Sequence, residues 1–186
     1  MSNVYVALLH YPVYNKHREI VTTSITGFDL HDIARSSITF GIKNYYVVNP
    51  LPAQRDFVRR IFEFWMDEES LEFNWTRVAA FKLVKVKVDL DEVIKDIEEK
   101  HGMKPKIIGT SAKPHATIGY EELRSEMENE ERPFLILFGT GWGIADEFFD
   151  RMDLVLPPIE GNTEYNHLSV RSATAIILYK LLGKGV

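Results

Sequence analysis

Two segments near the C-terminus hold the residues best suited to binding a small molecule: PFLILFGTGWGIADEFF, from Pro133, and LVLPPIEGNTEYNHLSVRSATAIILYKLL, from Leu154. In each, a short apolar strand runs into a loop of glycines, prolines and small polar residues and then into a helix. Glycines at 139, 141 and 143 would let the first loop adopt positive φ and approach a flat ligand closely. Two such loops at the carboxyl ends of neighbouring parallel strands would form one binding crevice.

The loop sequences narrow the class of ligand. GTGWGI, from Gly139, is not the GxGxxG of dinucleotide folds, and the chain has no GxxxxGK[ST] phosphate loop. The apolar run Leu156-Pro157-Pro158-Ile159 instead suits an adenine ring held by backbone hydrogen bonds without a phosphate contact. S-adenosylmethionine is such a ligand. The alternative is that the glycines serve only to make tight turns.

Other common site chemistries find little support. The chain has no cysteine, which excludes disulfides, a thiolate nucleophile and cysteine-based metal sites. Its six histidines show neither HxxxH nor HExxH spacing, so no metal is expected.

The net charge of −5 argues against a protein that coats nucleic acid by charge alone. Two basic stretches could still follow phosphates or simply be solvated surface. One comprises Arg77, Lys82, Lys85 and Lys87, and the other comprises Lys16, His17 and Arg18 beside Tyr11 and Tyr14.

The hydrophobic pattern predicts the elements that hold the loops. Residues 3–11 are almost all apolar and predict a central parallel strand, and the polar stretch 12–27 predicts a long loop. We hypothesise that this loop orders only when RNA is present. Asp29 is the expected N-cap of a helix that stops at Gly41.

The remaining predicted elements alternate between strand and helix. In order they are a strand over 44–50, a helix over 52–69 with a core stripe of Phe57, Ile61, Phe64 and Trp65, a short helix and a lysine-bearing edge strand over 76–88, a helix over 89–102, a strand over 104–112 and a polar helix over 120–132. This alternation predicts an α/β fold: a mostly parallel sheet with helices on both faces.

The bulk properties predict one domain, 1–186, because 186 residues with 45% hydrophobic content can bury a full core. No secretory leader is recognisable, and no apolar run approaches the roughly 20 residues that span a bilayer, so we expect a soluble, cytoplasmic protein without membrane contact. Small residues at 169, 172, 173 and 175 would allow close approach to the last helix. We expect Asn166 to cap that helix and its apolar side to pack in the domain or against a second subunit.

Three segments resemble, in order, the motifs of the SPOUT, or α/β-knot, RNA methyltransferases. Residues 29–50 (DLHDIARSSITFGIKNYYVVNP) are similar to the first SpoU-branch motif, a helix with an arginine that ends in FG before a strand. Residues 135–153 resemble the second motif, a strand, a glycine loop and an acidic helix, and residues 156–182 resemble the third. The motifs cover roughly half of the chain, and the most similar group is a bacterial one with no assigned RNA target.

The resemblance implies a trefoil knot in the C-terminal part, a homodimer, and S-adenosylmethionine bound in the crevice with RNA across both subunits. The activity it implies is methylation of tRNA or rRNA at a ribose 2′-oxygen or a base nitrogen. The loop at 110–112 also looks like the first cofactor loop of the branch that methylates N1 of guanine in tRNA. The cofactor contacts expected are Thr110, Ser111, Ala112, Phe138, Gly139, Thr140, Gly141, Gly143, Leu156, Pro157, Pro158, Ile159, Tyr165, Asn166, His167 and Leu168.

Arg35 matches the motif arginine, and His167 could act as a base, so these two are the expected catalytic residues. Two departures leave the methylated atom open. The glycine loop lacks the SpoU glutamate, and Tyr165 and His167 stand where that branch has serine and asparagine. The alternatives are a catalytically silent module that binds S-adenosylmethionine and RNA, and an NAD-dependent enzyme.

Overall fold

The computed structural model describes residues 3–66, 72–113 and 115–185, and its main sheet has six parallel strands. Their order is β5 (Val84–Lys87), β4 (Tyr45–Val48), β1 (Val4–Leu9), β7 (Phe134–Gly139), β6 (Lys106–Gly109) and β8 (Leu154–Val155). Every neighbouring pair in this sheet is parallel. The predicted parallel sheet is therefore confirmed, with β1 in its interior and β5 at one edge as expected.

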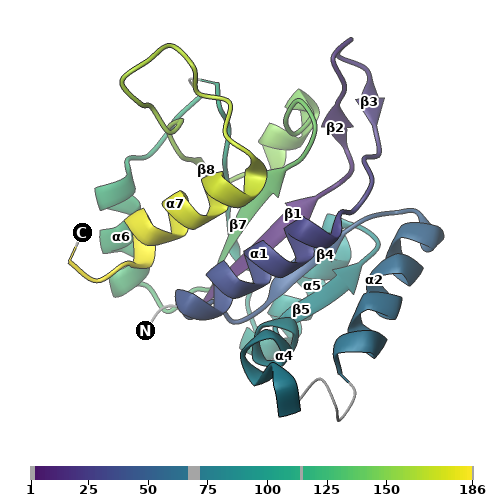
Figure 1. The fold of residues 1–186 in the computed structure, drawn as a ribbon. Helices are drawn as coiled ribbons and strands as arrows, with labels where there is room; N and C mark the ends of the chain where they lie inside the picture. Colours follow the sequence, from purple (N-terminus) through teal and green to yellow (C-terminus); the bar gives the residue numbers. More distant parts are fainter. Residues whose placement is uncertain (1–2, 67–71, 114, 186) are drawn as a thin grey trace.

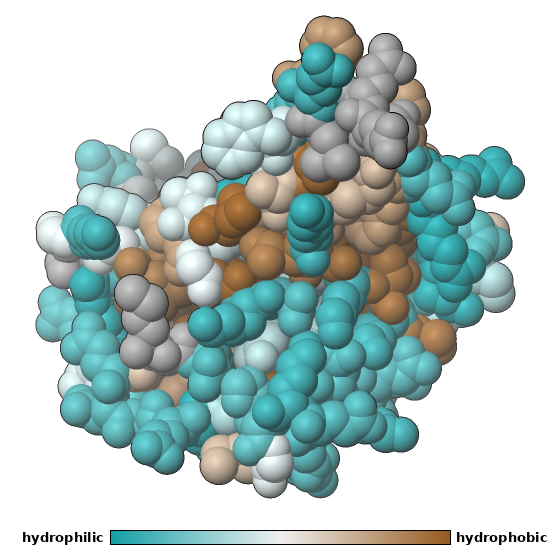
Figure 2. Space-filling model, turned by 90° about the horizontal axis from the view of Figure 1, so that it is seen from below, coloured by the Kyte–Doolittle hydropathy of each residue, from teal (hydrophilic) through white to brown (hydrophobic). Residues whose placement is uncertain are grey.

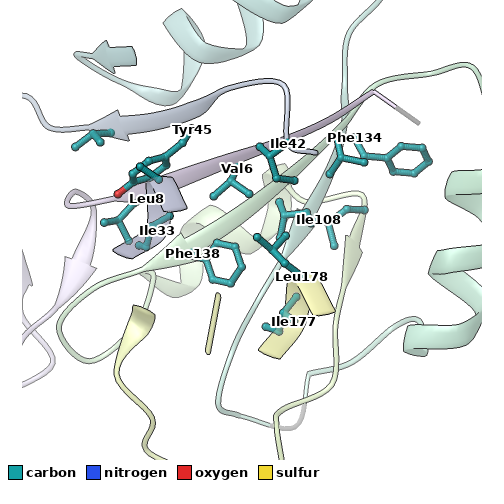
Figure 3. Packing of buried hydrophobic residues seen from close by; sticks show 14 of the residues in the cluster. Val6, Leu8, Ile33, Ile42, Tyr45, Ile108, Phe134, Phe138, Ile177 and Leu178 are labelled. Carbon is teal, nitrogen blue, oxygen red and sulfur yellow. The ribbon is translucent and has the colours of Figure 1, made fainter. Parts of the chain in front are cut away.

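Side chains alternate between two buried faces of the sheet, as strand geometry requires. Val6 and Leu8 belong to the larger cluster, beneath α1 (Gly27–Thr39) and α7 (Val170–Leu182), whereas Ala7 and Leu9 belong to the smaller one. Figure 1 shows α1 and α7 side by side in front of the sheet and α5 (Leu90–His101) behind it. In the larger cluster Phe138 of β7 lies near Ile177 and Leu178 of α7 (Figure 3).

The structure also describes the helices α2 (Pro52–Trp65), α4 (Trp75–Phe81) and α6 (Tyr120–Asn129) and a 3-10 helix, η1 (Asp146–Arg151). The prediction of a helix that ends at Gly102 is confirmed in detail. Asp89 accepts from the backbone N–H of Glu92, and Gly102 terminates α5 with φ of +70°. That conformation carries no steric cost for glycine.

Two predictions about helix ends and one about helix type are wrong. Thr26, not Asp29, caps α1, because the Thr26 hydroxyl accepts from the Asp29 N–H at 3.2 Å. Ser169, not Asn166, caps α7 and accepts from the Ser172 N–H. The acidic segment after the glycine loop forms the 3-10 helix η1 rather than an α-helix.

The predicted core stripe of α2 is only partly right. The residues that pack inward are Val58, Ile61, Phe62 and Trp65, which recur at helical spacing on one side. Phe57 and Phe64 lie off this line and are 40% and 64% exposed. The predicted extension of this helix to Glu69 lies outside the described residues.

The segment 12–27, predicted as a long loop, contains a β-hairpin. β2 (Val13–Tyr14) pairs antiparallel with β3 (Ile20–Val21), and the pair projects beyond the sheet at the top of Figure 1. The Tyr14 N–H donates to the Gly143 carbonyl, and the Trp142 N–H donates to the Tyr14 carbonyl, both at 2.9 Å. The hairpin is thus hydrogen-bonded to the glycine loop within the chain itself. That the segment 12–27 orders only with RNA stays a prediction.

Seen from below, the surface is mostly hydrophilic with a band of hydrophobic residues across it (Figure 2). Within the described ranges, no helix is long and apolar enough to cross a membrane. In the same residues no group of three or more histidine, aspartate or glutamate side chains is arranged to hold a metal ion.

Candidate active site

A cavity of about 750 Å³ lies beyond the carboxyl ends of β6 and β7, against α1 and α7. The parallel register brings the strand ends together, because Leu9 of β1 lies opposite Gly139 of β7 and Leu137 lies opposite Gly109 of β6. The volume falls in the range of about 300–1,000 Å³ that small-molecule sites occupy. The position is also the one where open parallel sheets bind their ligands.

Most of the predicted cofactor residues line this cavity: Thr110, Ser111, Ala112, Phe138, Gly139, Thr140, Gly141, Gly143, Pro157, Ile159, Asn166, His167 and Leu168. Leu156, Pro158 and Tyr165 do not. Leu156 is buried in the larger core cluster, and Tyr165 is 71% exposed. Both loops therefore reach one site, as expected from their place at neighbouring strand ends.

The structure adds lining residues that the sequence reading did not assign to the site: Thr23, Ser24, Thr26, Asp29, Lys113, Trp142, Ile144, Phe149, Ser169, Val170, Ala173 and Ile177. The first four precede the glycine loop by more than a hundred positions, so only the tertiary fold brings them there. A local signal did exist. Thr26 and Asp29 have the spacing of a capping box, which marks a helix N-terminus.

The glycine loop makes a tight turn against the hairpin. Gly141 and Gly143 have φ of +60° and +98°, which favour glycine. A Cβ on Gly141 would lie 2.8 Å from the Tyr14 carbonyl oxygen, so this residue permits the close contact between loop and hairpin. Gly141 thus shapes the cavity through the hairpin.

A chain of hydrogen bonds supports the loop from below. His10 Nδ1 lies 3.1 Å from the Thr23 hydroxyl, which contacts the Thr140 hydroxyl, and Thr140 donates to the Leu9 carbonyl at 3.2 Å. All three contacts are satisfied when Thr140 donates to Leu9, Thr23 to Thr140, and His10 Nδ1–H to Thr23, whose hydroxyl also lies 3.5 Å from the His10 carbonyl oxygen. In this arrangement His10 Nε2 carries no proton, and Nε2 is buried without a hydrogen-bond partner.

Among the described lining residues, three side chains can titrate: Asp29, Lys113 and His167. Asp29 is 9% exposed, accepts from the Thr26 hydroxyl at 2.7 Å and lies 3.6 Å from the guanidinium of Arg171. Lys113 lies 3.6 Å from Asp146. The cavity therefore contains a fixed carboxylate, a cation and an imidazole.

The two predicted catalytic residues lie in different places. His167 lines the cavity and packs edge-on against Tyr165, with ring centroids 5.7 Å apart. Arg35 lies on the exposed side of α1 and does not line the cavity. Within one copy of the chain, the structure does not bring the two together.

A family model described as SAM-dependent RNA methyltransferase matches residues 3–183, which is nearly the whole chain. The chain belongs to this family of RNA methyltransferases. Its cofactor is therefore S-adenosylmethionine, as predicted from the loops.

Relatives at the sequence level agree with the family. A protein of Aquifex aeolicus described as uncharacterized is 44% identical over 184 residues, covering 98% of this chain and 90% of the relative. A protein of Oleidesulfovibrio alaskensis named tRNA (guanine-N(1)-)-methyltransferase is 41% identical over 181 residues. The match covers 97% of this chain but 42% of that relative, so the name describes a much longer protein.

Solved structures share the fold. A probable methylase family protein from Haemophilus influenzae superposes with a TM-score of 0.64 at 19% identity, over 97% of this chain and 65% of that one. The SpoU methyltransferase AviRb from Streptomyces viridochromogenes, solved with AdoMet, superposes with a TM-score of 0.58 at 14% identity, over 98% and 58% of the two chains. This RNA methyltransferase therefore has the SPOUT class of α/β fold.

The cavity fits the cofactor of the family. Phe138, Pro157, Ile159 and Ile177 give it an apolar part suited to an adenine ring, and the loops after β6 and β7 add backbone and hydroxyl groups. The Asn166 amide donates to the Ala112 carbonyl at 3.1 Å and ties the α7 loop to the β6 loop. The polar and apolar parts of the cofactor thus each have suitable groups in the cavity.

Proposed function

We propose that this RNA methyltransferase acts on a transfer RNA and that the cavity beyond β6 and β7 is its cofactor site. The relatives from Oleidesulfovibrio alaskensis and Nitratidesulfovibrio vulgaris named as tRNA methyltransferases support the substrate class. The chain spans 42% of each, so their guanine-N1 specificity is one candidate among several. The single observation that supports the site is that the glycine loop after β7 and the loop with Pro157 and Ile159 after β8 line one cavity.

S-adenosylmethionine supplies a methyl group on a positively charged sulfur. The protein therefore mainly binds and orients the cofactor and the RNA and removes a proton from the methyl acceptor. The apolar residues around Phe138 and Ile159 would hold the adenine. His167 and Asp29 both reach the cavity and can accept the proton that an N–H or O–H acceptor loses on methylation. Arg35 would act from outside its own cavity.

A homodimer would explain how Arg35, which lies outside the cavity of its own chain, could act in catalysis. Phe28, Asp32, Arg35 and Ile38 form one exposed stripe of α1, and Tyr179 is exposed on the neighbouring helix α7. We propose that two copies pair across this surface, which would bring Arg35 to the second copy. The resemblance of the three sequence motifs to the SpoU branch implies this arrangement and a trefoil knot in the C-terminal part. We also propose a single domain over 1–186. We also propose that the protein works in the cytoplasm.

Isothermal titration calorimetry with S-adenosylhomocysteine tests the site. Ala173 of α7 lines the cavity, so Ala173→Leu should weaken binding about tenfold or more by overfilling it. Ala53→Leu, the same change at an exposed position of α2, should leave binding unchanged. Absence of binding by the wild-type protein would sink the proposal.

Transfer of label from S-adenosylmethionine to unfractionated tRNA, from a strain that lacks this protein, tests the activity. We expect label in tRNA and none in rRNA prepared alongside. Label in rRNA alone would contradict the substrate class. Cofactor binding without label in either RNA would favour the silent binding module.

A further inference from the structure

Trp142 is a large aromatic side chain that is exposed to solvent at the edge of the cavity. It lines the cavity and is 65% exposed. Its position is fixed by its backbone, because its N–H donates to the Tyr14 carbonyl at 2.9 Å and glycines with positive φ flank it. An exposed indole at the mouth of a binding site is a ready surface for a flat ring to stack on.

The depth of the cavity separates Trp142 from the apolar part suited to adenine. Phe138, whose side chain is 1% exposed, and Ile177, which is 4% exposed, form the inner wall. Trp142 belongs to the outer rim, where a ring arriving from solvent would meet it first. The indole is therefore better placed for the second substrate than for the cofactor.

Cations lie in the cavity lining and on the hairpin beside it. Lys113 lines the cavity, and Arg18 of the hairpin stacks on the Tyr14 ring at 4.7 Å. Both lie within 4 Å of Asp146, which neutralises part of their charge. Lys16, in the hairpin turn, is exposed. An aromatic platform beside cations is the combination that single-stranded or unstacked nucleotides bind.

We propose that Trp142 stacks on the target nucleotide of the RNA and that the hairpin at 13–21 contacts the neighbouring phosphates. This proposal rests on the proposed function, since it assigns the RNA side of the same cavity. A base to be modified must leave its stack, and a stacking partner in the enzyme offsets part of that cost. Trp142 is thereby a substrate-binding residue that selects an accessible, unpaired nucleotide.

Steady-state methylation of unfractionated tRNA tests the role of Trp142. Trp142→Ala should raise KM for tRNA by about 5- to 150-fold, the range of one stacked base, while Trp142→Phe should lose much less. Trp75→Phe is the matched control, because Trp75 is 69% exposed on α4 and does not line the cavity. The affinity for S-adenosylhomocysteine should be the same in all four proteins.

Tryptophan fluorescence gives a second readout that does not need turnover. Unfractionated tRNA, added in the presence of S-adenosylhomocysteine, should quench the wild-type and Trp75→Phe proteins but not Trp142→Phe. An unchanged KM in Trp142→Ala, equal quenching in Trp142→Phe, or a loss of cofactor affinity in Trp142→Ala would each overturn the proposal. Quenching by tRNA without methyl transfer would instead count against the proposed function and leave the stacking role in place.

Discussion

His10 directly follows the strand β1 and has a fully buried imidazole whose Nε2 has no partner. Burial lowers its pKa from 6.5 to about 4, since the charged form would lose its hydration. The bare nitrogen and the lowered pKa agree on a neutral ring that donates from Nδ1 to Thr23. His10 therefore supports the glycine loop only while it is uncharged.

This predicts a loss of stability in acid. The unfolded chain binds a proton at His10 below about pH 6.5 whereas the folded chain does so only near pH 4, so stability falls as pH drops through that window. The contribution is about 3 kcal/mol of the free energy of unfolding. Urea unfolding between pH 7 and pH 4 should show a smaller decline for His10→Asn than for the wild type. Parallel curves would contradict the assignment.

Among the described lining residues of the cavity, Asp29 is the one with a carboxylate. Its substitution therefore tests which residue removes the proton. Asp29→Asn keeps the shape of the side chain but removes its ability to accept a proton. If Asp29 is the base, kcat should fall about 10²- to 10⁴-fold with cofactor affinity unchanged. Asp56→Asn is the control, because Asp56 also pairs with an arginine, Arg59, but lies on α2 and does not line the cavity.

The same assay on His167→Gln completes the comparison. Equal kcat in wild type and Asp29→Asn, with a large fall in His167→Gln, would assign the base to His167. Rate profiles against pH would then show which residue supplies the acidic limb.

At the scale of elements, the lysines of edge strand β5 are held by the helix behind it. Lys85, Lys87 and Lys100 all pair with Asp96 of α5, and the Tyr46 hydroxyl donates to the same carboxylate. Burial acts to raise the pKa of Asp96, but hydrogen bonds from Lys100, Tyr46 and Lys85 outweigh it and keep that pKa below its ordinary value. Lys85 and Lys87 therefore serve the α5–β5 contact, which favours solvated surface over phosphate tracking for this stretch.

The hairpin and the glycine loop behave as one unit, and Gly141 is the residue that joins them. In Gly141→Ala the new Cβ would meet the Tyr14 carbonyl in a backbone conformation that costs alanine about 1–3 kcal/mol. Trypsin should cut after Lys16 or Arg18 faster in this variant than in the wild type. Gly119→Ala, where a Cβ has open space and φ is −83°, should digest at the wild-type rate. Equal rates in all three proteins would show that the hairpin does not depend on Gly141.

At the scale of the whole molecule, the proposed dimer predicts a change in mass. Ile38 is 41% exposed on the α1 stripe that carries Arg35, so Ile38→Glu should place a charge in the interface and give monomers in sedimentation velocity. Met103→Glu, at a similarly exposed residue beyond α5, should stay dimeric. Methylation should fall in Ile38→Glu if Arg35 works across the interface. A monomeric wild-type protein would remove the basis for that role.

The sequence predicted the parts of the fold that depend on local rules. The apolar pattern of residues 3–11 and 44–50 marked two interior strands, and Asp89 with Gly102 marked both ends of α5. Errors arose where two local signals competed, as between Thr26 and Asp29 for the cap of α1. They also arose where burial depends on a neighbour, as for Phe57 and Phe64 of α2.

By itself, the sequence determined the two loops, the cofactor class and about half of the residues that line the cavity, because strand, turn and helix signals lie within a few positions of one another. Only the tertiary structure decided that Thr23 to Asp29 complete the cavity, that Trp142 lies at its mouth and that Arg35 lies outside it. The reason is the register of parallel strands far apart in the chain. Leu9 lies opposite Gly139, so the hairpin and α1 that follow β1 meet the glycine loop that follows β7.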